Sequence, residues 1–224
     1  MLKKRFSQNL IKDKNIIKKI VNAMDIGGND IIIEIGAGQG DLTEYIAKKV
    51  RYVYAIEIDK SFKRNHYAIE KEYRNISFIY DDVLKISFAS FCKTENCKVI
   101  GNIPYNITGP ILFKAFNERE YIESAYFTIQ KEVALRIVSP PGKRIYGALS
   151  VIAQLLSRPK ILFYMKPSVF IPPPKVESAL LFLDFKEDTT AGLAKELIDF
   201  ITICFRNKRK FMKYALTKHF GKEK

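Results

Sequence analysis

Residues 31–40 read Ile-Ile-Ile-Glu-Ile-Gly-Ala-Gly-Gln-Gly, a continuous apolar run that ends in three alternating glycines. A short run of this kind is typical of a strand buried on both faces of a parallel sheet. A helical pattern follows from Asp41 to about Lys49. Strand, glycine turn and helix form a layout found in nucleotide-binding α/β proteins, so the sequence predicts an open, mostly parallel α/β sheet.

Three later apolar segments extend this pattern. Residues 52–56, 76–80 and 98–101 each predict a buried strand. Acidic or amide side chains follow these strands: Glu57, Asp81 and Asp82, and Asn102. The carboxyl ends of the strands in such a sheet form the edge where ligands bind, so we expect these side chains to lie close together.

The remaining elements continue the α/β pattern until the chain changes character at Lys186. Apolar spacing predicts helices near 16–24, 111–116, 131–138 and 149–156, and strands at 125–129, 160–165 and 178–185, the last two paired. From Lys186 a charged spacer leads to an amphipathic helix at about 191–205 and then to a basic run. We therefore expect a main α/β domain over residues 1–185 and a small basic helical segment over residues 186–224.

The charge of the chain points to a polyanionic partner. Among 224 residues, 38 Lys and Arg stand against 24 Asp and Glu, which gives a formal net charge of +14. A field of this sign attracts polyanions, and nucleic acid is the leading candidate. A single surface lysine is more often only solvated. The candidate phosphate contacts are Lys143, Arg144, Arg206, Lys208, Arg209 and Lys210.

Composition disfavours several other classes. No apolar run approaches the roughly 20 residues of a membrane-spanning helix, and the basic N-terminus lacks the apolar stretch of a signal peptide. We therefore expect a cytoplasmic protein with no membrane partner. The three cysteines, Cys92, Cys97 and Cys204, show no CxxC spacing, and His66 and His219 lie far apart. Reduced thiols and no metal site are expected.

The glycine turn suits one class of cofactor. Gly36, Gly38 and Gly40 form GxGxG, whereas the dinucleotide fingerprint is GxGxxG, and a plain tight turn is the alternative. Glu57 follows about 20 residues later, where an acidic side chain can hydrogen-bond ribose hydroxyls. This combination fits the adenosine of S-adenosylmethionine.

Two further strand ends carry groups that suit adenine rings. After the third strand, Asp82 would accept from the cofactor's adenine amine and the Val83 N–H would donate to a ring nitrogen, with Asp81 as the alternative to Asp82. Residues 102–105, Asn-Ile-Pro-Tyr, follow the fourth strand. Their side-chain amide and carbonyls can accept both hydrogens of an exocyclic amine while the aromatic ring stacks on the attached base. A proline-terminated strand with a tyrosine in the core is the structural alternative.

These motifs together resemble the rRNA adenine dimethyltransferases, S-adenosylmethionine-dependent enzymes with a Rossmann-like α/β sheet. The resemblance also rests on Phe-Ser-Gln-Asn at 6–9, Gln-Lys-Glu-Val-Ala at 130–134, Tyr-Gly-Ala-Leu-Ser-Val at 146–151 and Phe-Ile-Pro-Pro-Pro-Lys-Val-Glu-Ser at 170–178. It runs in order from about residue 4 to residue 220. The sequence is most similar to the branch that modifies two adjacent adenosines near the 3′ end of small-subunit rRNA.

The resemblance implies roles for individual residues. Ser7, Leu10 and Ile103 replace the family's usual Gly, aromatic residue and Leu, and the family's C-terminal helical domain is longer, so we expect an incomplete one here. Tyr105 and Phe170 would stack on the two faces of the target adenine; packing beside the prolines is the alternative for Phe170. The catalytic residues would be Asn102, Pro104, Tyr105 and Phe170, and the cofactor contacts Asn9, Ile11, Gly36, Gly38, Glu57, Ile58, Asp82, Val83 and Asn102.

The implied activity is N6,N6-dimethylation of small-subunit rRNA, as free RNA or as a pre-assembled small subunit, by a monomer. Two alternatives stay open: a large-subunit rRNA adenine methyltransferase of the antibiotic-resistance type, and a non-catalytic ribosome-assembly factor. Residues 146–151 and the three prolines at 172–174 favour the small-subunit branch. Intact Glu57, Asp82 and residues 102–105 favour an enzyme, and the positive charge disfavours a small-molecule substrate.

Overall fold

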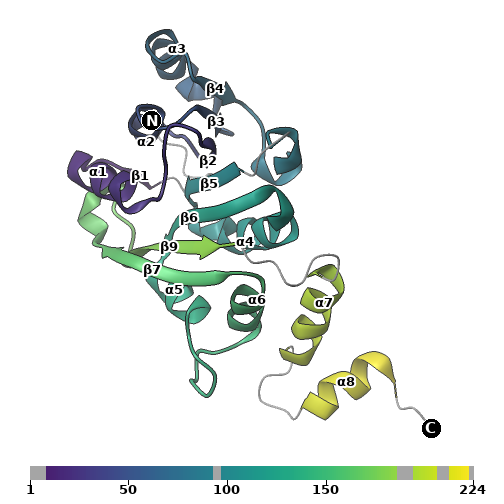
Figure 1. Cartoon of the computed structure of the whole chain (residues 1–224). Helices are drawn as coiled ribbons and strands as arrows, with labels where there is room; N and C mark the ends of the chain where they lie inside the picture. Colours follow the sequence, from purple (N-terminus) through teal and green to yellow (C-terminus); the bar gives the residue numbers. More distant parts are fainter. Residues whose placement is uncertain (1–8, 93–96, 186–193, 206–211, 222–224) are drawn as a thin grey trace.

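A seven-stranded sheet forms the centre of the computed structural model, which describes residues 9–92, 97–185, 194–205 and 212–221 (Figure 1). The strands lie in the order β4-β3-β2-β5-β6-β9-β7. The first five run parallel, and β9 runs antiparallel to β6 and β7, so the predicted sheet and the predicted pairing of the last two strands are confirmed. Their bounds are β2 Ile31–Ile35, β3 Tyr52–Ile56, β4 Ile76–Ile79, β5 Cys97–Asn102, β6 Ile122–Gln130, β7 Arg158–Met165 and β9 Ser178–Asp184.

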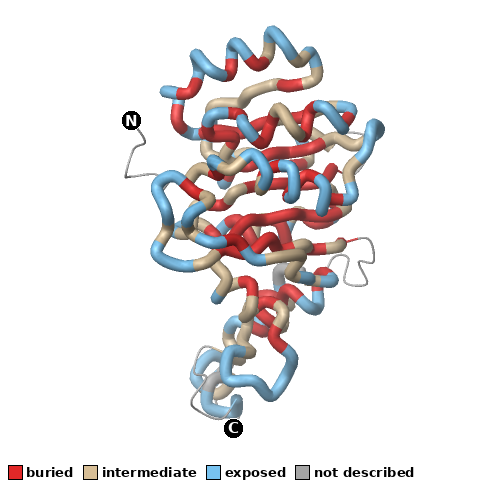
Figure 2. Tube along the Cα trace, turned by 90° about the vertical axis from the view of Figure 1, so that its left-hand side faces the viewer, coloured by how far each residue is buried: buried red, intermediate tan, exposed pale blue. Residues whose placement is uncertain are grey.

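Helices cover both faces of this sheet. One hydrophobic cluster joins the sheet to α1 (Lys14–Ala23), α2 (Asp41–Ala47) and α3 (Lys63–Glu72). A second cluster joins the opposite face to α4 (Thr108–Asn117), α5 (Lys131–Ile137), α6 (Ala148–Leu156) and α7 (Ala194–Phe205). Figure 2 shows the buried residues gathered along the strands, with the outer sides of the helices exposed. The last helix, α8 (Met212–Phe220), lies beyond α7 (Figure 1).

Strand β2 divides its side chains between these two clusters. Successive side chains of a strand point to opposite faces. Ile33 and Ile35 join the cluster under α4 to α7, whereas Ile32 joins the one under α1 to α3. Glu34 has the parity of Ile32 and is 1% exposed, so its carboxyl group lies on the face that α1 and α2 cover.

A two-stranded antiparallel sheet ties the N-terminal segment to the middle of the chain. Strand β1 (Leu10–Ile11) pairs with β8 (Phe170–Ile171), so that Ile11 lies opposite Phe170. The N–H of Lys12 also donates to the carbonyl of Val169 over 2.9 Å. This pairing holds the segment that begins at Asn9 against the carboxyl ends of the central strands.

The C-terminal part continues the core over the residues that the structure describes. Ile198 and Ile201 of α7 are 8% and 6% exposed and belong to the cluster that includes α4 and α6. The predicted domain boundary at Lys186 lies outside the described residues and stays a prediction.

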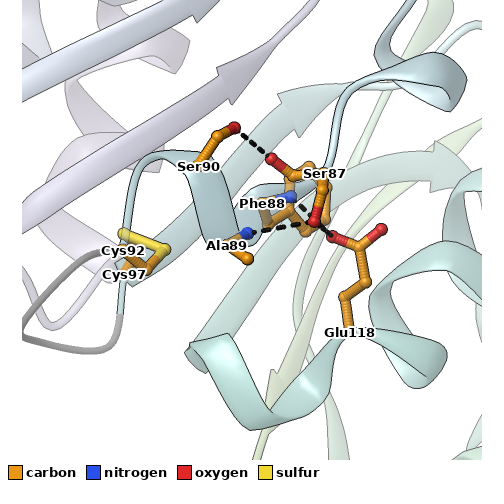
Figure 3. Close-up of a disulfide and its surroundings, with 7 residues drawn as sticks. All are labelled: Ser87, Phe88, Ala89, Ser90, Cys92, Cys97 and Glu118. Atoms are coloured by element: carbon orange, nitrogen blue, oxygen red, sulfur yellow. Dashed lines mark hydrogen bonds between the residues drawn. A yellow bond between two sulfur atoms is a disulfide. The ribbon is translucent and has the colours of Figure 1, made fainter.

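The prediction of reduced thiols is wrong for two of the three cysteines. Cys92 and Cys97 form a disulfide with their Cα atoms 5.6 Å apart, a separation that a disulfide spans readily (Figure 3). Cys92 follows the turn of residues 88–90 and Cys97 begins β5, so the fold brings them together although their spacing matches no familiar motif. Cys204 is a free thiol.

Candidate active site

An open cavity lies where the order of the strands reverses. After β2 the chain builds β3 and β4 on one side, and it then crosses to β5 on the other. Such a switch point is where doubly wound sheets bind ligands. The cavity brings together these predicted residues: Asn9, Gly36, Gly38, Glu57, Ile58, Asp82, Val83, Asn102, Pro104 and Tyr105.

The glycine turn after β2 holds the carboxylate of Glu57. The N–H of Gly38 donates to Glu57 Oε2 over 2.8 Å, and the N–H of Asp59 donates to Oε1 over 2.8 Å. Burial raises the pKa of Glu57, while these two hydrogen bonds act in the opposite direction. Gly38 has φ +58°, a backbone conformation that residues with a side chain rarely adopt, so this turn favours glycine.

Glu34 supplies a second, more deeply buried carboxyl group close to the glycine turn. Glu34 lines a smaller cavity beside the main one, together with Gly36 and Asn102. Burial raises the pKa of Glu34 to about 7, and the charge of Glu57 adds to the shift, whereas the Thr43 hydroxyl opposes it. Among the described residues, no group hydrogen-bonds Glu34 Oε2. Glu34 therefore takes up a proton far more readily than an exposed glutamate.

The turn after β4 places two carboxylates at the cavity. Asp82 Oδ1 accepts from the N–H of Leu84 over 3.0 Å, and the N–H of Asp82 donates to Asp81 Oδ1 over 2.7 Å. Both aspartates line the cavity, so the choice between them stays a prediction. Val83 is buried, and Ile58 is 46% exposed at the rim.

The end of β5 presents an oriented amide. Asn102 Nδ2 donates to the backbone carbonyl of Asn9 over 2.6 Å. Since a carbonyl can only accept, the nitrogen of the amide must face Asn9, and Oδ1 keeps its capacity to accept. Tyr105 is half-buried, and its hydroxyl shares a 2.7 Å hydrogen bond with Ser178 Oγ at the start of β9. Burial raises the pKa of Tyr105, so the phenol is neutral at pH 7.

The structure does not bring every predicted residue to the main cavity. Phe170 is 2% exposed and packs in the core cluster under α1 to α3, and Ile11 lines only the smaller cavity. Phe170 opposes Ile11 across the β1–β8 pair, and this pairing turns its ring into the core. The structure thus places the Phe170 ring as the packing alternative expects, and its stacking on a target adenine stays a prediction.

The basic candidates divide between described and undescribed residues. Lys143 and Arg144 are exposed in the turn between α5 and α6. Arg206, Lys208, Arg209 and Lys210 lie outside the described residues. Within the described ranges, no group of three or more His, Cys, Asp or Glu could hold a metal ion, and no helix is long and apolar enough to span a membrane.

The sequence analysis did not identify three residues that hydrogen-bond to the residues of the site or to one another: His66, Tyr80 and Ser178. His66 contacts the carbonyl of Gly38, Tyr80 contacts His66, and Ser178 contacts Tyr105. For His66 the signal was its spacing on α3, since Phe62, His66 and Ile69 share the buried face of one helical segment.

The fold and this site define a Rossmann-like, S-adenosylmethionine-dependent methyltransferase. More specifically, the chain belongs to the ribosomal RNA adenine dimethylase family, whose model matches residues 1–224. The motifs at the glycine turn and at residues 102–105 belong to this matched region.

Sequence relatives cover almost the whole chain. The ribosomal RNA small subunit methyltransferase A of Caldanaerobacter subterraneus subsp. tengcongensis is 37% identical over 220 residues, which are 96% of this chain and 82% of that protein. The protein of the same name from Mycoplasmopsis synoviae is 37% identical over 224 residues, covering 99% of this chain and 85% of that one.

Two solved structures share the fold. A dimethyladenosine transferase from Plasmodium falciparum superposes with a TM-score of 0.83 at 29% identity, covering 95% of this chain and 76% of that one. The 23S rRNA methyltransferase ErmE superposes with a TM-score of 0.77 at 23% identity, covering 94% and 84%, and this likeness concerns the fold alone.

Proposed function

We propose that the chain transfers methyl groups from S-adenosylmethionine to N6 of two adjacent adenosines near the 3′ end of small-subunit rRNA. Membership in the adenine dimethylase family and relatives named for the small subunit support this assignment over the large-subunit alternative. The observation that carries the chemistry is the Asn102 amide, which Asn9 orients at the end of β5.

The cavity suits the adenosine part of S-adenosylmethionine. Glu57 has both carboxylate oxygens fixed by backbone N–H groups and is positioned to accept from ribose hydroxyls. Asp82 or Asp81, with Val83, would bind the adenine ring at the next strand end, and Ile58 would cover it from the rim. When bound, the cofactor supplies an electrophilic methyl group on its sulfonium.

Residues 102–105 would hold the amine that receives the methyl group. The N6 lone pair of adenine is delocalised into the ring and becomes a better nucleophile when acceptors bind both N6 hydrogens. Asn102 Oδ1 is one acceptor. The carbonyl of Pro104 already accepts from the Ile107 N–H over 3.1 Å and the Thr108 hydroxyl over 3.4 Å, so we assign the second acceptor to the Ile103 carbonyl.

Positioning is the main contribution of these residues. Effective molarities of about 10⁵ M or more show that correct placement supplies a large part of the rate. The methylated nitrogen becomes acidic and loses its proton to solvent, so no strong general base is required. The adenine must leave its stack to enter the cavity, and Tyr105 would then stack on one face, a contact worth about 1–3 kcal/mol per base.

The test is transfer of labelled methyl groups to small ribosomal subunits that lack the modification, followed by mass spectrometry of the nucleosides. Dimethyladenosine in small-subunit RNA, with none in large-subunit RNA, is expected. Asn102→Ala should lower the rate at least about a hundredfold, since placement is lost. Asn117→Ala, an exposed amide on α4, is the matched control. Transfer by Asn102→Ala within a few-fold of wild type would refute the mechanism.

The same assay separates the alternatives. Methyl transfer to large-subunit RNA alone would favour the antibiotic-resistance type. Cofactor binding without transfer to either RNA would favour the assembly factor. We further propose that the protein acts in the cytoplasm as a monomer and contacts RNA phosphates through Lys143, Arg144 and the basic run at 206–210.

A further inference from the structure

A buried histidine lies behind the glycine turn. His66 of α3 is 0% exposed, and its ring stacks on Phe78 with centroids 3.7 Å apart and planes within 6°. Its Nε2 lies 2.8 Å from the carbonyl oxygen of Gly38, and its Nδ1 lies 2.7 Å from the hydroxyl of Tyr80. The imidazole therefore bridges β4 and the turn after β2.

These partners fix the position of the ring proton. The carbonyl of Gly38 has no proton to give, so Nε2 must carry the hydrogen and donate it. In a neutral ring Nδ1 then accepts, and the hydroxyl of Tyr80 is its donor. Burial lowers the pKa of His66, which favours this neutral form at pH 7.

Gly38 connects His66 to Glu57, because it hydrogen-bonds both side chains through its own backbone. Gly38 accepts from His66 at its carbonyl and donates to Glu57 Oε2 at its N–H. With φ +58°, Gly38 adopts a conformation that glycine enters without steric cost, and these two contacts are its own hydrogen bonds within the turn. Losing the histidine would leave a buried carbonyl without its donor, and the turn would move to reach another one.

We propose that His66 is a positioning residue for S-adenosylmethionine: it holds Gly38 so that the N–H of Gly38 keeps the Glu57 carboxylate aimed into the cavity. Tyr80 holds His66 in the tautomer that this requires. The inference rests on the proposed role of Glu57 as the ribose-binding carboxylate. His66 itself touches neither cofactor nor RNA.

The first test is the tautomer in the intact protein. The chain has two histidines, so ¹⁵N spectra of the ring nitrogens are assigned by comparison with His219→Gln. We expect a protonated Nε2 and a bare Nδ1 for His66 at pH 7.5, with and without bound S-adenosylhomocysteine. A protonated Nδ1 with a bare Nε2 would overturn the proposal, because that ring cannot donate to Gly38.

The second test is calorimetric binding of S-adenosylhomocysteine to variants. Gln places its amide nitrogen near the position of Nε2, whereas Asn reaches only the position of Nδ1. His66→Asn should therefore bind about tenfold more weakly, and His66→Gln should stay within about threefold of wild type. Tyr80→Phe should lose about threefold, because the donor that fixes the tautomer is gone. Tyr67→Asn, an exposed neighbour on α3, is the control.

The outcomes separate this inference from the proposed function. Equal losses for His66→Asn and His66→Gln, or none for either, would overturn the positioning role. Glu57→Ala supplies the reference: if it binds S-adenosylhomocysteine as wild type does, the proposed site itself is wrong. If Glu57→Ala loses binding while both His66 variants keep it, only the inference fails. Should His66→Asn not fold, Tyr80→Phe and the tautomer decide.

Discussion

Glu34→Gln should stabilise the protein in a manner that depends on pH. The folded chain raises the pKa of Glu34 to about 7 from an ordinary value of 4.5. Between these values the folded state binds more protons than the unfolded state, so stability falls as the pH rises through this window, and the loss is complete above pH 7. The sign is opposite to that of a salt-bridged carboxylate.

The size follows from the shift. At about 1.4 kcal/mol for each pKa unit, the raised pKa of Glu34 lowers the free energy of unfolding, relative to its value at low pH, by about 3 kcal/mol at pH 8 and by about 1 kcal/mol at pH 5. Gln has nearly the same shape and cannot ionise. Relative to wild type, Glu34→Gln should therefore gain about 2 kcal/mol of stability between pH 5 and pH 8.

The assay is urea unfolding at pH 5, 6, 7 and 8. At each pH the free energy of unfolding of the variant is compared with that of the wild type. Other titrating groups, His66 among them, cancel in this difference. Glu132→Gln, whose side chain is 82% exposed on α5, is the control and should show a flat difference. A flat difference for Glu34→Gln as well would show that Glu34 is ionised at no cost, and the reasoning from its burial would be refuted.

Three further perturbations have defined outcomes. Because burial lowers the pKa of His66, stability should fall as the pH drops below the ordinary histidine value of 6.5, where the unfolded chain takes up the proton; His66→Gln should flatten this loss in urea unfolding. Ser178→Ala removes the partner of the Tyr105 hydroxyl. Steady-state kinetics should show methyl transfer falling about twofold to tenfold while the affinity for S-adenosylhomocysteine stays constant. A parallel loss of affinity would show that Ser178 acts on the cofactor and not through Tyr105. Deleting residues 206–224 should flatten the salt dependence of RNA affinity, because log affinity falls with log salt in proportion to the phosphates contacted; an unchanged slope would exclude this segment from the RNA interface.

The strand-end residues could be predicted from the sequence because their positions depend on local pattern. Apolar runs end at Ile35, Ile56 and Gly101, and parallel pairing places the residues that follow at one edge. Gly38, Glu57 and Asn102 therefore line one cavity, as expected.

Other features depend on contacts between distant parts of the chain. The inward position of Phe170 follows from its pairing with β1, some 160 residues earlier, and no local pattern encodes that register. The spacing of His66 on α3 indicates that it is buried, but its partners, Gly38 and Tyr80, come from other elements, so its role could not be predicted from the helix alone. The Cys92–Cys97 disulfide likewise follows from where a turn meets a strand.

The orientation of Asn102 shows what a motif leaves undetermined. A strand end followed by Asn-Ile-Pro-Tyr supplies an amide, but the amide can turn either its oxygen or its nitrogen to the cavity. The carbonyl of Asn9, held beside it by the β1–β8 pair, accepts from the nitrogen and so leaves the oxygen for the adenine amine of the proposed mechanism. If the proposed mechanism holds, the N-terminal strand contributes through its backbone, and weakening its pairing with β8 should impair methyl transfer even with Asn102 intact.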